Sequence, residues 1–231
     1  MERSQFHTLP LGIDNCYLIE GERCVLVDGG APGQTRAFVE RLAALGIAPS
    51  RIGLIILTHA HWDHIGSAAA LVELTGAKLA IHAHERHIVE QGLKSMPPAV
   101  TPWGRVFGTL LRAFLPFVTI APVRVDIALG DDGLSLEPYG IRGKVLHTPG
   151  HSRGSVSVVL DSGEAFVGDL AMNGLPLTRR PDLPIFAEDI DAVKASWRKL
   201  LALGVTTIYP AHGRSFAASV IERRLTKQTV A

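Results

Sequence analysis

The chain has 231 residues and a formal net charge of +1, with 47% hydrophobic and 19% charged residues. This composition is typical of a folded globular protein and excludes an intrinsically disordered chain. A nearly neutral chain carries no broad positive field, so we expect no nucleic acid partner. The opening MERSQFHTLP lacks the apolar run of a signal peptide, and Cys16 and Cys24 suit buried free thiols, so we expect a cytoplasmic protein.

Strands and helices alternate along the chain, which predicts an α/β protein with a single domain over residues 1–231. The predicted strands are NCYLIE (15–20), CVLVD (24–28), LIILT (54–58), KLAIH (78–82), GKVLHT (143–148), SVSVVL (155–160), AFVGD (165–169) and TTIYP (206–210). The apolar spacing predicts helices that begin near Gln34, Ile65, Glu85, Trp103, Ile190 and Ala217.

The most apolar stretch, residues 106–123, contains a single charge, Arg112. A charge near the middle of a span costs roughly 2.5–3.5 kcal/mol on insertion scales, and Pro116 interrupts the helix, so we expect no membrane span. Helical spacing places four apolar side chains on one face: Trp103, Phe107, Leu110 and Phe114. We interpret residues 97–123 as an amphipathic insertion that serves either as a lid over the functional site or as a homodimer interface.

The segment HAHWDH follows the apolar strand LIILT and concentrates strong metal ligands in six positions: His59, His61, Asp63 and His64. Burying four such groups together without partners costs much free energy, because each loses its hydration. A metal ion offsets both their desolvation and their mutual repulsion. The segment therefore predicts a metal site in a strand-to-helix loop.

Other predicted strands also end on histidine or aspartate. His151 follows a strand in TPGHS, Asp169 ends VGD, His212 lies in PAHG, and Asp28 ends CVLVD. In α/β proteins the carboxyl ends of strands are the common location of functional sites. We therefore expect these residues to converge with the HAHWDH segment.

With these motifs in this order, the sequence resembles the metallo-β-lactamase-fold superfamily of metallohydrolases over roughly residues 15–213. The resemblance implies a four-layer αββα sandwich with metals at one edge of the paired sheets. It implies a first ion on His59, His61 and His151. It implies a second ion on Asp63, His64 and His212, with Asp169 bridging the two. The resemblance also implies that Asp28 is not a ligand but supports the HAHWDH loop by hydrogen bonds.

The implied chemistry is hydrolysis. Five neutral imidazoles, two carboxylates and one hydroxide carry −3 against +4 for two divalent ions, which leaves an electrophilic centre. Such a centre keeps water deprotonated near neutral pH, so a hydroxide can attack a carbonyl group while Asp63 passes the proton. Zinc is the default for these ligands, and iron or manganese are alternatives.

The preferred function is therefore hydrolysis of an ester, thioester or lactone bond in a small molecule with a hydrophobic part. Asp169 stands where β-lactamases have cysteine or serine, which disfavours antibiotic hydrolysis. Three alternatives remain: a mononuclear iron persulfide dioxygenase, a phosphodiesterase acting on a small phosphoester, and a non-catalytic binding module. The dioxygenase branch usually has a Gly-Arg-Thr-Asp-Phe-like stretch after the fourth motif, where this chain reads AMNGLPLTRRPDLPIF. A nucleic acid substrate would leave a basic stripe that is absent here, so only a small phosphoester remains for the phosphodiesterase. The complete ligand set disfavours a binding module.

The sequence indicates the roles of several other polar residues less clearly. His82, His84 and His87 in IHAHERH are interpreted as the surface junction of a strand and a helix, and His147 as a support for the metal site. Arg179 or Arg180 in PLTRRPD is a candidate for holding a substrate carboxylate, with a solvated turn as the alternative.

Overall fold

The computed structural model describes residues 5–174 and 181–227, so Arg179 and Arg180 lie outside the described residues. The first half of the chain forms one six-stranded sheet, in the order β1-β2-β3-β4-β5-β6. Its strands span Phe6–Leu11, Asp14–Ile19, Cys24–Val27, Ile52–Ile56, Lys78–His82 and Ile127–Leu129. The first three strands pair antiparallel, whereas β3 to β6 run parallel.

The second half of the chain forms the other six-stranded sheet, in the order β12-β11-β10-β9-β8-β7. Its strands, from β7 to β12, span Leu134–Ser135, Gly143–His147, Val156–Leu160, Glu164–Gly168, Thr207–Pro210 and Phe216–Ala217. Only β10 and β11 pair in parallel here. Strands β4, β9 and β10 are buried along their whole length, as expected for strands covered on both faces.

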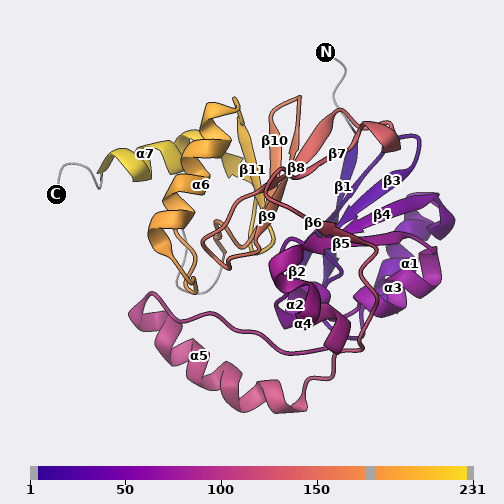
Figure 1. The fold of residues 1–231 in the computed structure, drawn as a ribbon, viewed down its shortest axis with the longest axis horizontal. Helices are drawn as coiled ribbons and strands as arrows, with labels where there is room; N and C mark the ends of the chain where they lie inside the picture. Colours follow the sequence, from indigo (N-terminus) through magenta and orange to yellow (C-terminus); the bar gives the residue numbers. More distant parts are fainter. Residues whose placement is uncertain (1–4, 175–180, 228–231) are drawn as a thin grey trace.

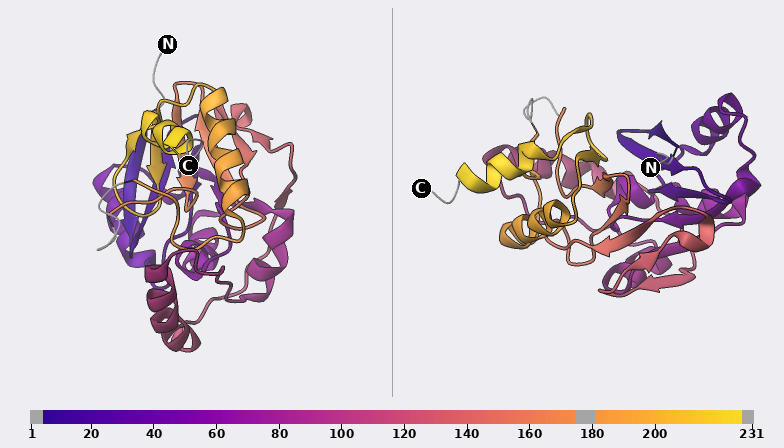
Figure 2. Two further views of the ribbon diagram at one scale, coloured as in Figure 1. Left: turned by 90° about the vertical axis from the view of Figure 1, so that its left-hand side faces the viewer. Right: turned by 90° about the horizontal axis from the view of Figure 1, so that it is seen from above.

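The α-helices other than α5 flank the sheets on their outer faces (Figures 1 and 2). From α1 to α7 they span Thr35–Ala44, Trp62–Ile65, Ala68–Thr75, Arg86–Gln91, Pro102–Phe114, Ile190–Ala202 and Ser219–Lys227. Phe38 of α1 and Leu71 of α3 pack on the first sheet, while Trp197 of α6 and Ile221 of α7 pack on the second.

A third apolar layer lies between the two sheets. Val25 and Ile56 of the first sheet share one buried cluster with Val158 and Phe166 of the second. Together with the outer clusters, this layer gives the order helix, sheet, sheet, helix, which confirms the expected four-layer αββα sandwich. Both cysteines are buried free thiols, as expected.

Every strand expected from the sequence is present within one or two residues at each end. Strands β1, β6, β7 and β12 were not expected. All four lie at sheet edges, and the last three have only two or three residues each. The helix expected from Ile65 is in fact two pieces, α2 and α3, separated at Gly66 and Ser67. A side chain at Gly66 would collide with Pro32, so this close approach requires glycine.

Helix α5 lies beside the sandwich rather than within its layers (Figure 1). Thr101 caps it by accepting a hydrogen bond from the Gly104 backbone N–H, and Pro102 begins it. Its buried side is only partly the expected one: Phe107 packs inward together with Leu111, whereas Leu110 and Phe114 are 63% and 51% exposed. Within the described part of the chain, none of the helices has the length and apolarity needed to cross a membrane.

Candidate metal centre

The HAHWDH segment bends around the carboxyl end of β4. His59 lies three residues beyond the strand, His61 caps α2, and Asp63 and His64 lie within that single-turn helix. His151 follows β8, Asp169 follows β10 directly, and His212 lies two residues beyond β11. Because these strand ends meet at one edge of the sandwich, the structure brings all seven of the expected ligands together.

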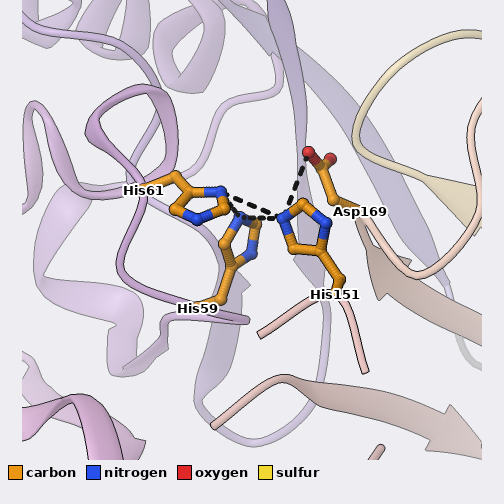
Figure 3. Close-up of side chains that lie close together, drawn as sticks. All are labelled: His59, His61, His151 and Asp169. Carbon is orange, nitrogen blue, oxygen red and sulfur yellow. Dashed lines mark hydrogen bonds and ion pairs between the residues drawn. The ribbon is translucent and has the colours of Figure 1, made fainter. Parts of the chain in front are cut away.

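Three imidazoles face one another at the first centre (Figure 3). His61 Nδ1 lies 2.8 Å from His59 Nε2 and 3.0 Å from His151 Nε2, and the two Nε2 atoms are 3.2 Å apart. The outer nitrogens of His59 and His151 contact Thr58 Oγ1 and the Phe186 carbonyl oxygen, so their Nε2 atoms present lone pairs, and one hydrogen on His61 Nδ1 cannot fully satisfy both. Their spacing suits ligands around one cation, whose bonds to nitrogen are about 2.0–2.1 Å long.

A second group of donors lies alongside: Asp14, Asp63, His64 and His212. Asp169 lies between the two groups. Its Oδ1 is 3.5 Å from His64 Nε2 and 3.4 Å from His212 Nε2, while its Oδ2 is 3.7 Å from His151 Nε2. One oxygen of Asp169 therefore faces each group, which is the geometry of a bridging carboxylate.

The outward nitrogens of these imidazoles contact fixed partners. His151 Nδ1 donates to the Phe186 carbonyl oxygen at 2.8 Å, and His64 Nδ1 lies 3.0 Å from Asp28 Oδ2. His59 Nδ1 lies 3.1 Å from Thr58 Oγ1. A hydrogen on Nδ1 leaves the lone pair of Nε2 directed into the site, as in metal-binding histidines.

Asp28 supports the loop rather than entering either group. Its Oδ1 accepts from the Thr58 backbone N–H at 2.7 Å, and both carboxylate oxygens lie 2.9 Å from Thr58 Oγ1. Its φ of +66° is a left-handed conformation that aspartate tolerates better than most residues. The backbone turn at Asp28 thus presents the carboxylate to Thr58 and His64 together.

The electrostatics of the site favour a cation. Burial lowers the pKa of His59, His61 and His151, so these imidazoles are neutral and available as ligands. Burial opposes charge on His64 and His212 too, but neighbouring carboxylates raise the pKa of both well above its ordinary value. Among the described residues, His64 Nε2 and Asp169 Oδ1 are buried without a hydrogen-bond partner. Buried ligand atoms without a hydrogen-bond partner are expected where metal ions bind.

Asp14 is a site residue that the sequence analysis missed. It begins β2, is 1% exposed, and places Oδ1 3.3 Å from His212 Nδ1. Both of its carboxylate oxygens lack a hydrogen-bond partner in the described structure, and burial raises its pKa well above the ordinary value. The signal available in the sequence was an aspartate directly before an apolar strand, which is too common to single out.

Glu85 was also missed, and it joins two ligand loops. It is 4% exposed, and its carboxylate accepts hydrogen bonds from the backbone N–H groups of Ala60 and Gly154. Ala60 lies between His59 and His61, and Gly154 lies in the loop that carries His151. The carboxylate of Glu85 therefore fixes the position of the His59 and His61 loop relative to the His151 loop.

His82 ends β5 as expected, but the expected surface position is wrong, because it is only 2% exposed. His147 belongs to neither group of ligands, and its Nε2 lies 2.8 Å from the Arg153 carbonyl oxygen in the loop that carries His151. Both histidines also contact Asp131.

A pocket opens above the two groups. The site residues at its floor are His61, Asp63, His151, Asp169 and His212. Its walls are apolar and comprise Ile13, Trp62, Met96, Pro97, Phe107, Leu111, Met172, Ile185 and Phe186, with Ser95 at the margin. An apolar pocket with convergent polar groups at one end is the usual form of a small-molecule site.

This fold and site have counterparts among known proteins. The family model of the metallo-beta-lactamase superfamily matches residues 9–212, and the chain belongs to this superfamily. The Probable metallo-hydrolase YflN of Bacillus subtilis is 27% identical over 222 residues, which cover 90% of this chain and 83% of that protein.

Two solved structures are similar to this chain in both fold and sequence. The BLEG-1 B3 metallo-beta-lactamase superposes with a TM-score of 0.66 and 28% identity, covering 93% of this chain and 95% of that chain. TTHA1623, solved in a di-iron-bound form, also has a TM-score of 0.66 and 28% identity, covering 94% and 97%. The named relatives and the two clusters of His and Asp together support a metal-dependent hydrolase.

The Glu85 contacts generate a first prediction. Glu85→Gln retains the shape of the side chain but replaces one acceptor oxygen with an amide group, so one of the two loops loses its hydrogen bond. Loss of such supporting contacts typically weakens metal affinity about 10–100-fold. We expect this loss in a zinc titration against a competing chelator, with Glu90→Gln on α4 as the control. Unchanged affinity in Glu85→Gln would show that the loops hold their positions without it.

Asp14 generates a second prediction. Asp14→Asn removes the charge that faces His212 Nδ1 and should weaken the binding of one ion per chain about 10–100-fold while leaving the other unchanged. Zinc content after dialysis at graded chelator concentrations measures both ions, and Asp132→Asn is the exposed control. Equal weakening of both ions would contradict the assignment of Asp14 to the second group.

Proposed function

We propose that the protein is a binuclear metal-dependent hydrolase that cleaves an ester, thioester or lactone bond in a small molecule with an apolar part. The observation that carries this proposal is the position of Asp169, which directs one carboxylate oxygen to each of the two groups. A carboxylate so placed, at the floor of an apolar pocket, suits two ions that act on one substrate.

In this proposal His59, His61 and His151 hold the first ion. Asp63, His64 and His212 hold the second, and Asp169 contacts both. Two divalent ions bound here would supply Lewis acidity and water that is deprotonated near neutral pH. Zinc is the preferred metal for five imidazoles and two carboxylates, and the di-iron form of TTHA1623 supports iron as the alternative.

Asp63 is the proposed carrier of the proton. Burial would raise the pKa of Asp63, but the hydrogen bond from His212 and the charge of His64 lower it below the ordinary value. The carboxylate is therefore ionised, and its Oδ2, 3.5 Å from His212 Nε2, faces the site. It can accept a proton from the attacking water and return it to the leaving group.

The pocket walls support an acyl substrate. Phe107 and Leu111 of α5 line the pocket and pack against Met172, Ile185 and Phe186, which line it too. These side chains would hold an apolar tail and exclude water from the reacting bond. Of the described residues that line the pocket, none is lysine or arginine, which favours a neutral carbonyl compound over a phosphoester.

The metal content of protein purified without added metal or chelator tests the proposal. We expect about two metal ions per chain by elemental mass spectrometry, and hydrolysis of at least one substrate in a panel of lactones, thioesters and aryl esters. A single iron with negligible zinc would overturn it in favour of a persulfide dioxygenase. The panel includes a cephalosporin because of the similarity to BLEG-1, and activity confined to it would replace the proposed substrate class.

The role of α5 yields a fourth prediction. Replacing both Phe107 and Leu111 by Ala should raise KM for a long-chain ester by about tenfold or more, because apolar contacts of this size contribute about 1–3 kcal/mol. KM for the acetyl ester should change little. Leu110→Ala, on the exposed side of the same helix, is the matched control. Equal changes in KM for both chain lengths would show that α5 does not bind the acyl part.

A further inference from the structure

A third cluster of potential ligands lies apart from the two groups described above: His82, Asp131 and His147, whose donor atoms are all within 4.8 Å of one another. His82 ends β5 in the first sheet, and His147 ends β8 in the second. Asp131 lies between β6 and β7, in the connection that joins the two halves of the chain. The cluster therefore draws on both sheets and on the segment between them.

One oxygen of Asp131 faces both imidazoles. Its Oδ1 is 3.2 Å from His82 Nε2 and 2.9 Å from His147 Nδ1. The two rings stack with centroids 4.1 Å apart and planes 18° apart. Imidazole lone pairs lie in the ring plane, so one ion bound by both rings requires one ring to turn out of the stack. The cluster still places two nitrogens and one oxygen within 4.8 Å of one another.

The hydrogen bonding of His147 requires a positive species at this point. His147 Nε2 lies 2.8 Å from the Arg153 carbonyl oxygen, which can only accept, so the ring hydrogen belongs on Nε2. His147 Nδ1 then presents a lone pair to a carboxylate oxygen that also only accepts. Two acceptors 2.9 Å apart need a proton or a metal ion between them.

The distances suit a metal ion. Metal–ligand bonds of about 2.0–2.1 Å place neighbouring ligand atoms ~2.9 Å apart in an octahedral site and ~3.4 Å apart in a tetrahedral one. The two contacts of Asp131, at 2.9 and 3.2 Å, lie in this range. So do the contacts among His59, His61 and His151 at the first centre. If His82 bound the ion through Nε2, its ring hydrogen would move to Nδ1. His82 would then lose only the long hydrogen bond, 3.3 Å, that the His84 backbone N–H donates to Nδ1.

We propose that His82, His147 and Asp131 bind a divalent transition metal ion that clamps the two sheets together. Two imidazoles and one carboxylate suit Zn²⁺, Ni²⁺ or Cu²⁺, with water completing the coordination. Asp131 is 78% exposed, so an ion can reach the site directly from solvent. The clamp would also steady the metal centre, because His147 lies four residues before His151 and His82 three residues before Glu85.

The test uses the full chain with its catalytic metals in place, dialysed against buffered Zn²⁺ and analysed by elemental mass spectrometry. We compare wild type with Asp131→Ala and His147→Gln, because His82 is buried and its replacement would disturb the core. His7→Gln is the matched control, since His7 contacts Glu20 at 2.7 Å in a partly buried pair that belongs to no cluster of three ligands among the described residues.

We expect wild type and His7→Gln to bind one zinc per chain more than Asp131→Ala and His147→Gln. Added zinc should then raise Tm in the first two proteins and not in the others, because a ligand that binds only the folded state stabilises it. Equal zinc content in all four would overturn the proposal and leave a hydrogen-bonded cluster. A loss of zinc in His7→Gln would also overturn it, by showing non-specific surface binding.

Discussion

The burial of nine titratable side chains at one edge of the sandwich is the constraint on which the rest of the structure depends. Five imidazoles and four aspartates there are each less than 9% exposed: Asp14, Asp28, His59, His61, Asp63, His64, His151, Asp169 and His212. Removing so many polar groups from water is costly unless each finds a partner. Hydrogen bonds satisfy the outer atoms of several of them, such as His64 and His151, and the unpartnered atoms of Asp14, His64 and Asp169 fit bound cations.

The two sheets must pack before this edge exists. Strand β2 of the first sheet holds the loop of His212 in the second, through hydrogen bonds from Asn15 to the Gly213 carbonyl and from Tyr17 to the Pro210 carbonyl, both 2.7 Å long. Glu85 joins the loops of His59 and His151 in the same way. The geometry of the metal centre is therefore a consequence of sheet packing, and the apolar layer between the sheets supports it indirectly.

The pocket and the proposed clamp use the same edge for different purposes. Helix α5, outside the four layers, contributes Phe107 and Leu111 to the pocket walls, so in the proposed function a helix beside the sandwich contacts the substrate without altering the metal ligands below. His82 and His147 lie at the ends of β5 and β8 and make their own cluster with Asp131. A fold that ends many strands at one edge can thus place separate sets of ligands there.

The sequence by itself determined the strands, the order of the motifs and the residues that converge on the centre, because short β-branched runs and the ligands that follow them are local features of the chain. The tertiary structure alone decided which distant groups support them. Asp14 meets His212 from the opposite end of the chain, and Asp131 meets His82 and His147 from a connection without regular structure. The periodicity of α5 placed Phe107 on the apolar face, but the contact with Phe186 decided that Leu111, rather than Leu110 or Phe114, is buried beside it. The local sequence predicts the chemistry of each residue and the periodicity of each element. The contacts named above depend instead on how the two sheets pack.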